Sequence, residues 1–115
     1  MPIHIVKQPI SREELKSIAQ ERYGDLVKAV VDVEQGIMVI GGELHADEEV
    51  LLMEQESSRR EHTWGINLYT EKTGEDFLEF DSMVNLKPSF GNRSRNVENS
   101  EIREKIKVIV GKLIV

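Results

Sequence analysis

The chain has 115 residues, 39% of them hydrophobic and 31% charged, with a formal net charge of −6. This length fits one domain, the mixed charges and apolar runs argue against disorder, and the acidic balance argues against a general nucleic-acid coat protein. Cysteine is absent, which excludes disulfides and thiolate chemistry, and the lack of a signal peptide or membrane-spanning run predicts a cytoplasmic protein.

The start of the chain predicts an edge strand followed by a helix. Ile3–Val6 is a short apolar run that ends before Pro9. Ser11 and Glu14 have the spacing of a capping box, in which the serine caps the helix and the glutamate occupies its third position. Gly24 suits the position just beyond the end of this helix.

Two β-hairpins are predicted in the middle of the chain. Leu26–Val33 and Ile37–Ile40 are alternating or β-branched runs separated by a tight turn, which indicates the first hairpin. Trp64–Tyr69 and Phe77–Lys87 form the second hairpin by the same alternation. Ser82 interrupts the last of these runs, which indicates a bulge or a break there.

The acidic segment between the hairpins, His45–Gln55, is open to two interpretations. Asp47 can cap a short helix that contains Val50 and Met53, because acidic residues are stabilising near the positive N-terminal end of a helix. A strand through Val50–Met53 is the alternative. The helix is the favoured interpretation.

The end of the chain predicts an amphipathic helix, which Asn99 or Ser100 caps. Its apolar residues repeat close to the helical period of 3.6, namely Ile102, Ile106, Ile109, Val110, Leu113 and Ile114. The predicted order is therefore β-α-β-β-(α)-β-β-α. Hairpins joined to helices predict a single α+β domain over residues 1–115, with a largely antiparallel sheet and two or three helices packed on one face.

The segment from Asn85 to Arg95 is the first candidate site, because it holds three cations and no acid in an acidic protein. Gly91 and Asn92 tolerate positive φ, so backbone N–H groups here can form an anion-binding nest. Arg93 and Arg95 carry planar donors suited to phosphate, Lys87 adds charge, and Asn85 can fix the loop. The alternative is that the arginines pair with acids on neighbouring elements.

Two further polar groups are candidates for catalysis. His45 and Asp47 follow a strand end and can act as acid and base or bind a divalent metal, although Asp47 is also explained as a helix cap. Glu79 and Asp81 share a strand face and can hold Mg²⁺, although a solvated sheet face is the favoured interpretation. No spacing matches a specific metal motif, so neither a metal nor a cofactor is assigned.

The order and spacing of several motifs resemble a family of short prokaryotic proteins of unknown function. These motifs are Gly41–Asp47, Trp64–Tyr69, Asn85–Ser89 and Gly91–Arg95, followed by Ile102 and Arg103. The resemblance covers nearly the whole chain and implies a stand-alone protein. It implies no activity, substrate or catalytic residue.

Three functions compete on these observations. The first is a binding module for a phosphate-bearing ligand, a nucleotide or RNA, held by the loop Asn85–Arg95. The second is a regulatory module whose acidic surface, including Glu43–Glu56, binds a basic protein partner. The third is a small metal-dependent enzyme that cleaves phosphodiesters, with His45, Asp47 and Asp81 among its catalytic groups.

Overall fold

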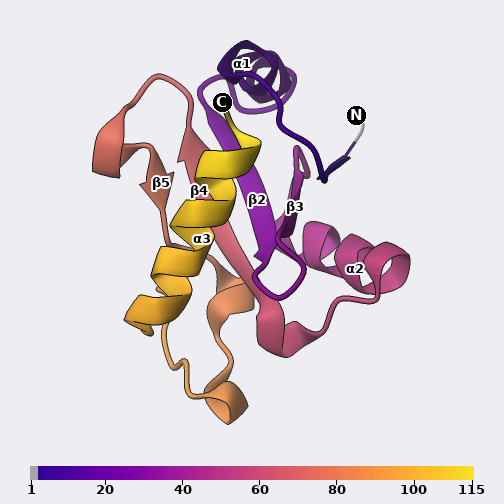
Figure 1. The fold of residues 1–115 in the computed structure, drawn as a ribbon, viewed down its shortest axis with the longest axis vertical. Coiled ribbons are helices and arrows are strands. Elements are labelled where there is room, and N and C mark those ends of the chain that lie inside the picture. The colour runs from indigo at the N-terminus through magenta and orange to yellow at the C-terminus, as the bar shows by residue number, and fades with distance from the viewer. Residues whose placement is uncertain (1–2) are drawn as a thin grey trace.

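A computed structural model describes residues 3–115 as a five-stranded antiparallel sheet with three α-helices (Figure 1). The strand order is β1-β3-β2-β4-β5, in which the strands are β1 (His4–Val6), β2 (Leu26–Asp32), β3 (Ile37–Ile40), β4 (Thr63–Tyr69) and β5 (Leu78–Glu79). The α-helices are α1 (Arg12–Gln20), α2 (His45–Glu56) and α3 (Ser100–Leu113). Short 3-10 turns complete the chain: η1 (Arg60–His62), η2 (Gly74–Asp76), η3 (Met83–Asn85) and η4 (Pro88–Phe90). The predicted α+β class and the edge position of β1 are confirmed.

Short-range signals define the best predicted elements. The hydroxyl of Ser11 accepts the N–H of Glu14 at 3.1 Å, and the side chain of Asn99 accepts two N–H groups in the first turn of α3. Each contact satisfies a donor that the start of a helix leaves without a partner. In the first hairpin, Asp32 accepts the N–H groups of the turn that follows it, and Gly36 adopts a φ of +70°.

The main core lies between one face of the sheet and helices α1 and α3. Alternate residues of β2 point towards this core, and their partners on β4 do the same, since Ala29 pairs with Ile66 and Val31 with Trp64. The helices contribute the residues that their periodicity predicts, namely Leu15, Ala19, Ile106, Ile109, Val110 and Leu113.

Helix α2 covers the opposite face of the sheet, so the prediction that all helices pack on one face is wrong. Leu52 joins Val30, Ile37 and Val39 in a second, smaller apolar cluster there. The sequence of β2 already indicates that both faces of the sheet are covered, because apolar residues occupy odd and even positions of the strand. A strand that is apolar on both faces has to be covered on both.

The helical interpretation of α2 is confirmed, but the predicted cap at Asp47 is wrong. Leu44, not Asp47, is the N-cap, and Val50 and Met53 are 51% and 40% exposed. The buried face instead carries His45, Glu48, Glu49 and Leu52. These polar groups turn inwards because they find partners inside: the carboxylate of Glu48, for example, accepts the N–H of Gly42 at 2.9 Å.

The second hairpin is shorter than predicted, because β5 ends at Glu79 and the extended run to Lys87 is wrong. A break does occur at Ser82, whose hydroxyl accepts the N–H of Val84 and starts η3. The segment from Ser82 to Val84 then packs closely against β4 at Gly65. A Cβ atom at Gly65 would come within 2.5 Å of the Ser82 hydroxyl, so only glycine allows this approach.

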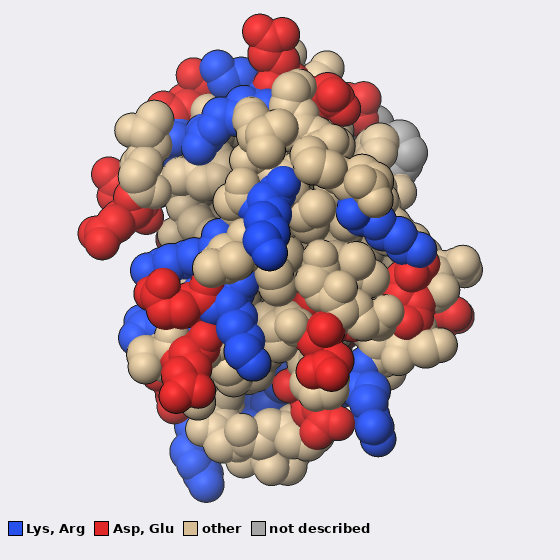
Figure 2. Space-filling model, in the orientation of Figure 1, with Lys and Arg blue, Asp and Glu red and all other residues tan. Residues whose placement is uncertain are grey.

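The acidic run around α2 is less acidic at the surface than its sequence indicates. Glu48 and Glu49 are buried, and Glu56 contacts Lys7 at 2.7 Å. Figure 2 shows acidic and basic side chains interspersed over the face it presents. The segment around α2 therefore presents fewer free carboxylates to a basic partner than its sequence indicates.

Candidate functional site

The candidate site is built on the segment Asn85–Arg95, which Asn85 fastens to the middle of the sheet. Its amide oxygen accepts the N–H of Gly65 at 2.8 Å, and its amide nitrogen donates to the carbonyls of Gly65 and Arg95 at 3.0 and 2.9 Å. The side chain is fully buried and pairs with β4 as another peptide group would. Asn85 thus positions the loop.

Asn92 closes the same segment from within. Its amide nitrogen lies 2.7, 3.1 and 2.7 Å from the carbonyl oxygens of Asn85, Ser94 and Asn96. Its amide oxygen accepts the N–H of Glu98 at 2.9 Å. Both the amide nitrogen and the amide oxygen of Asn92 are therefore engaged by the backbone of residues 85–98.

Lys87 points into the protein, where the structure gives it an acidic partner. Its ammonium lies 3.1 Å from Oε2 of Glu49, and its side chain has no exposed surface. Thr63 donates to the same oxygen at 2.7 Å, and Arg60 approaches the other carboxylate oxygen at 3.6 Å. Burial lowers the pKa of Lys87, although the charge of Glu49 opposes this change.

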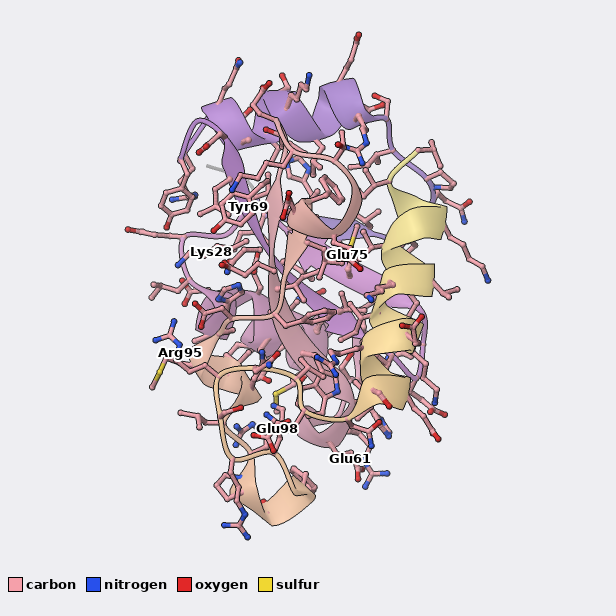
Figure 3. All side chains as sticks on the ribbon, turned by 90° about the vertical axis from the view of Figure 1, so that its left-hand side faces the viewer. Lys28, Glu61, Tyr69, Glu75, Arg95 and Glu98 are labelled. Atoms are coloured by element: carbon pink, nitrogen blue, oxygen red, sulfur yellow. The ribbon has the colours of Figure 1, made fainter. Side chains whose placement is uncertain are left out.

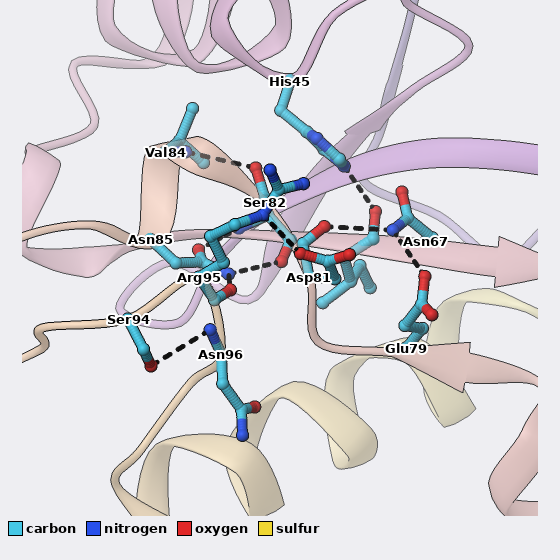
Figure 4. Close-up of polar contacts among 12 residues, drawn as sticks. His45, Asn67, Glu79, Asp81, Ser82, Val84, Asn85, Ser94, Arg95 and Asn96 are labelled. Atoms are coloured by element: carbon cyan, nitrogen blue, oxygen red, sulfur yellow. Dashed lines mark hydrogen bonds and ion pairs between the residues drawn. The ribbon is translucent and has the colours of Figure 1, made fainter.

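The two arginines have different surroundings. Arg93 is exposed, and its side chain forms no ion pair with any residue in the range 3–115. Arg95 lies on the side of the molecule seen in Figure 3, and its Nε contacts Oδ1 of Asp81 at 2.6 Å (Figure 4). The side chain of Arg95 remains 55% exposed, so its other donors face outwards.

Arg95 and Asp81 line a cleft of about 380 Å³ beside the start of α2. The cleft also contains His45, Lys28 and residues from the second hairpin. Figure 3 shows Lys28 and Arg95 on the same side of the protein as Tyr69. The full lining comprises Leu26, Lys28, Leu44, His45, Ala46, Asn67, Tyr69, Glu79, Asp81, Ser82, Met83, Val84 and Arg95.

His45 contributes a nearly buried imidazole to this cleft. Its Nε2 lies 2.8 Å from the carbonyl oxygen of Ile66, which can only accept, so Nε2 carries the proton. Nδ1 is then left as an acceptor in the neutral ring. Burial is the largest cause that lowers the pKa of His45, and the charge of Lys28 lowers it further. A neutral imidazole with a free lone pair is suited to accept a proton.

Asn67 and Tyr69 form the polar floor of the cleft. The amide nitrogen of Asn67 donates to Glu79 and to the carbonyl of Asp81 at 2.9 and 3.0 Å (Figure 4). The nearby side chain of Asn67 raises the pKa of His45, and the acceptors of the amide nitrogen fix the orientation of the amide and therefore of its oxygen. That oxygen is buried and receives no hydrogen bond from the described part of the chain. Tyr69 donates to Glu79 at 2.9 Å.

The structure therefore brings only some of the predicted residues together. His45, Asp81 and Arg95 share the cleft, Asp47 lies outside it in the exposed first turn of α2, and Arg93 points elsewhere. Within residues 3–115, no three His, Asp or Glu side chains are grouped so as to hold a metal ion. Sequence reasoning did not identify Lys28, although strand pairing sets it directly opposite Asn67.

Comparison with known proteins gives one match. The model of a family described as "Protein of unknown function (DUF5674)" matches residues 4–113, which confirms the resemblance to a family without an assigned function. No curated protein and no solved structure matches the chain. None of the helices within residues 3–115 has the length and apolar character that a membrane span requires.

Proposed function

We propose that this chain, which belongs to the DUF5674 family of unknown function, binds a phosphate-bearing ligand, a nucleotide or a short RNA segment, in the cleft beside α2. The observation that carries the proposal is that Lys28, Asn67 and Arg95 line one cleft. In the described part of the chain, the amide oxygen of Asn67 has no hydrogen-bond donor. Two cations suit a phosphate, and a buried acceptor needs a donor.

The cations have free capacity for an anion. Arg95 uses Nε on Asp81, which leaves the two terminal nitrogens of its guanidinium group for a bidentate contact. Lys28 forms no ion pair with any residue that the structure describes, and its ammonium lies 5.5 Å from the centroid of the Tyr23 ring. In this proposal Arg95 and Lys28 contact the phosphate, whereas Asn85, Lys87 and Asn92 hold the loop in place.

The rest of the cleft favours a nucleotide over a simple anion. Asp81 offers carboxylate oxygens at the cleft, which suit the hydroxyl and amine donors of a ribose or a base. Leu44 and Met83 are 53% and 62% exposed at the cleft and offer apolar surface for a base to cover. Inorganic phosphate would use only the cations.

The test is a titration of ¹⁵N-labelled protein at low salt, followed by amide chemical shifts. The probes are AMP, UMP, a short oligoribonucleotide, adenosine and inorganic phosphate. We expect shifts at Lys28, Asn67 and Arg95 with the nucleotides or the RNA, and weaker binding as salt is added. Absence of localised shifts with every phosphate-bearing probe would reject the proposal.

A pair of arginine variants distinguishes the cleft from the exposed part of the loop. Arg95→Gln should weaken binding by about tenfold, which corresponds to the loss of one charge-assisted contact. Arg93→Gln is the matched control, because Arg93 is in the same loop but does not line the cleft. An equal effect of the two substitutions would place the ligand on the loop and contradict the cleft proposal.

A second candidate function is cleavage of phosphodiesters, which the shared cleft of His45, Asp81 and Arg95 favours. His45 would accept a proton and Arg95 would stabilise charge on the phosphate. The assay follows a short RNA with and without Mg²⁺. His45→Gln should lower the rate by about a hundredfold or more, and Asp47→Asn, outside the cleft, should not. Lack of cleavage by the unsubstituted protein under both conditions removes this candidate.

A further inference from the structure

We propose a second and separate ligand site, an apolar cleft that binds a small carboxylate with an apolar body. The cleft has a volume of about 540 Å³ and lies between η2, β5 and the C-terminal half of α3. Figure 1 shows β5 and α3 close to one another, and α2 with the polar cleft lies on the other face of the sheet. This site is therefore independent of the proposed nucleotide site.

The walls of this cleft are apolar. Phe77, Leu78 and Phe80 form one side, and the other is formed by Val110 of α3 and by Ile114, which directly follows that helix. Its volume lies within the range of small-molecule pockets, which are mostly apolar with a few polar groups that orient the ligand. Such walls favour an aliphatic or aromatic body.

Gly111 keeps the cleft open from the side of α3. Glycine is a poor residue for a helix interior, so its presence there calls for a reason. Packing does not supply one, because a Cβ atom at Gly111 would meet no other atom within 4 Å. Since Gly111 lines the cleft, the missing side chain leaves space for a ligand.

The charged groups at the cleft favour an anionic head group. Arg12 and Lys107 both line it, and the only acid in its lining within residues 3–115 is Glu75. Lys107 also contacts Glu104 at 3.5 Å, so Arg12 is the cation on which the preference for an anion rests. The guanidinium carbon of Arg12 lies 4.0 Å from the centroid of the Phe77 ring, and Arg12 has no acidic partner in the described chain. An arginine held on an aromatic ring beside an apolar cleft suits a carboxylate.

The test compares octanoate with octanol and octylammonium in titrations of ¹⁵N-labelled protein. We expect octanoate to shift the amides around Phe77 and Gly111, and to bind at least fivefold more tightly than the other two probes. Arg12→Gln should remove this preference without abolishing octanol binding. Gly111→Leu should abolish binding of octanoate, whereas Gly111→Ala, the matched control, should retain it.

Four outcomes would overturn the proposal. These are the absence of shifts with all three probes, equal binding of octanoate and octylammonium, octanoate binding that survives Gly111→Leu, and concentration-dependent dimerisation that Gly111→Leu removes. The last would assign the cleft to a second copy of the chain. Arg12→Gln, a change on the first turn of α1, keeps the test decisive if the leucine variant does not fold.

Discussion

Replacing Lys87 with methionine should destabilise the protein by about 2–4 kcal/mol. At the observed separation of 3.1 Å from Glu49, Coulomb's law with an effective dielectric constant of about 20 gives roughly 5 kcal/mol before the cost of desolvation. Removing one partner of a buried ion pair typically costs about 3–5 kcal/mol, because the other charge is left uncompensated. Glu49 keeps its contacts with Thr63 and Arg60, which moves the expected loss towards the lower end.

A double-mutant cycle isolates the pair. The single variants are Lys87→Met and Glu49→Gln, and the double variant should be more stable than the sum of their losses predicts, by roughly 2 kcal/mol. Urea denaturation followed by fluorescence measures each free energy of unfolding. Trp64, the only tryptophan, reports on this region directly, because the ammonium of Lys87 lies 5.6 Å from the centroid of its ring.

The outcome also decides what Lys87 does. A loss of stability below about 1 kcal/mol, with no coupling to Glu49, would refute the structural role that burial and pairing assign to this lysine. Weakened nucleotide binding by a fully stable Lys87→Met variant would return Lys87 to the set of ligand contacts.

Three further substitutions test the packing and the electrostatics of the buried polar residues and of the close approach at Gly65. Gly65→Ala should cost about 2–3 kcal/mol, because its Cβ would lie 2.5 Å from the Ser82 hydroxyl, and an unchanged melting temperature would contradict this packing. Asn92→Ala should cost about 2–3 kcal/mol in chemical denaturation, because buried carbonyls lose their donor, and a loss below about 1 kcal/mol would show that other contacts hold the loop. Burial raises the pKa of Glu48 in the folded protein well above 4.5, its ordinary value. Because the folded state then holds this proton more tightly than the unfolded state, the free energy of unfolding should fall as pH rises from 4.5 towards the folded-state pKa. Glu48→Gln carries no titrating group, so its stability relative to the original protein should rise across that window in urea titrations, and a pH-independent difference would refute the assignment.

The elements that the sequence predicted well are those decided within a few residues. Ser11 and Asn99 start their helices through contacts to the next turn, and Gly36 closes a tight hairpin. The orientation of α2 could not be predicted in this way. Glu49 turns inwards because it meets Lys87, which is 38 residues away in the sequence, and Val50 and Met53 are left outside as a result.

The candidate site was predicted in parts but not as a whole. The enzyme hypothesis grouped His45 and Asp81 with Asp47, which lies outside the cleft, and the binding hypothesis assigned Arg95 to the loop. The strand pairing together with the turn at Ser82 brings His45, Asp81 and Arg95 to one cleft. That Asn85 fixes the loop was expected, but its partner Gly65 lies 20 residues away and could not be identified from the sequence. Asn92 is held inside by backbone groups of its own loop, such as the carbonyl of Asn85 seven residues away. Lys28 belongs to the cleft through register alone.

One contact between the two ends of the chain has a mechanical consequence. Ile10 and Ile114 form a parallel bridge, in which the N–H of Ile10 donates to Leu113 at 2.8 Å and the N–H of Val115 donates to Ile10 at 2.9 Å. Pulling the residues before Ile10 away from Val115 loads both hydrogen bonds in shear, so they must break together instead of opening one after the other. Resistance to forced unfolding depends on the rate of such a step, and this bridge places a barrier at the C-terminal end of the described fold, whereas the pairing of β1 with β3 lies on the N-terminal side.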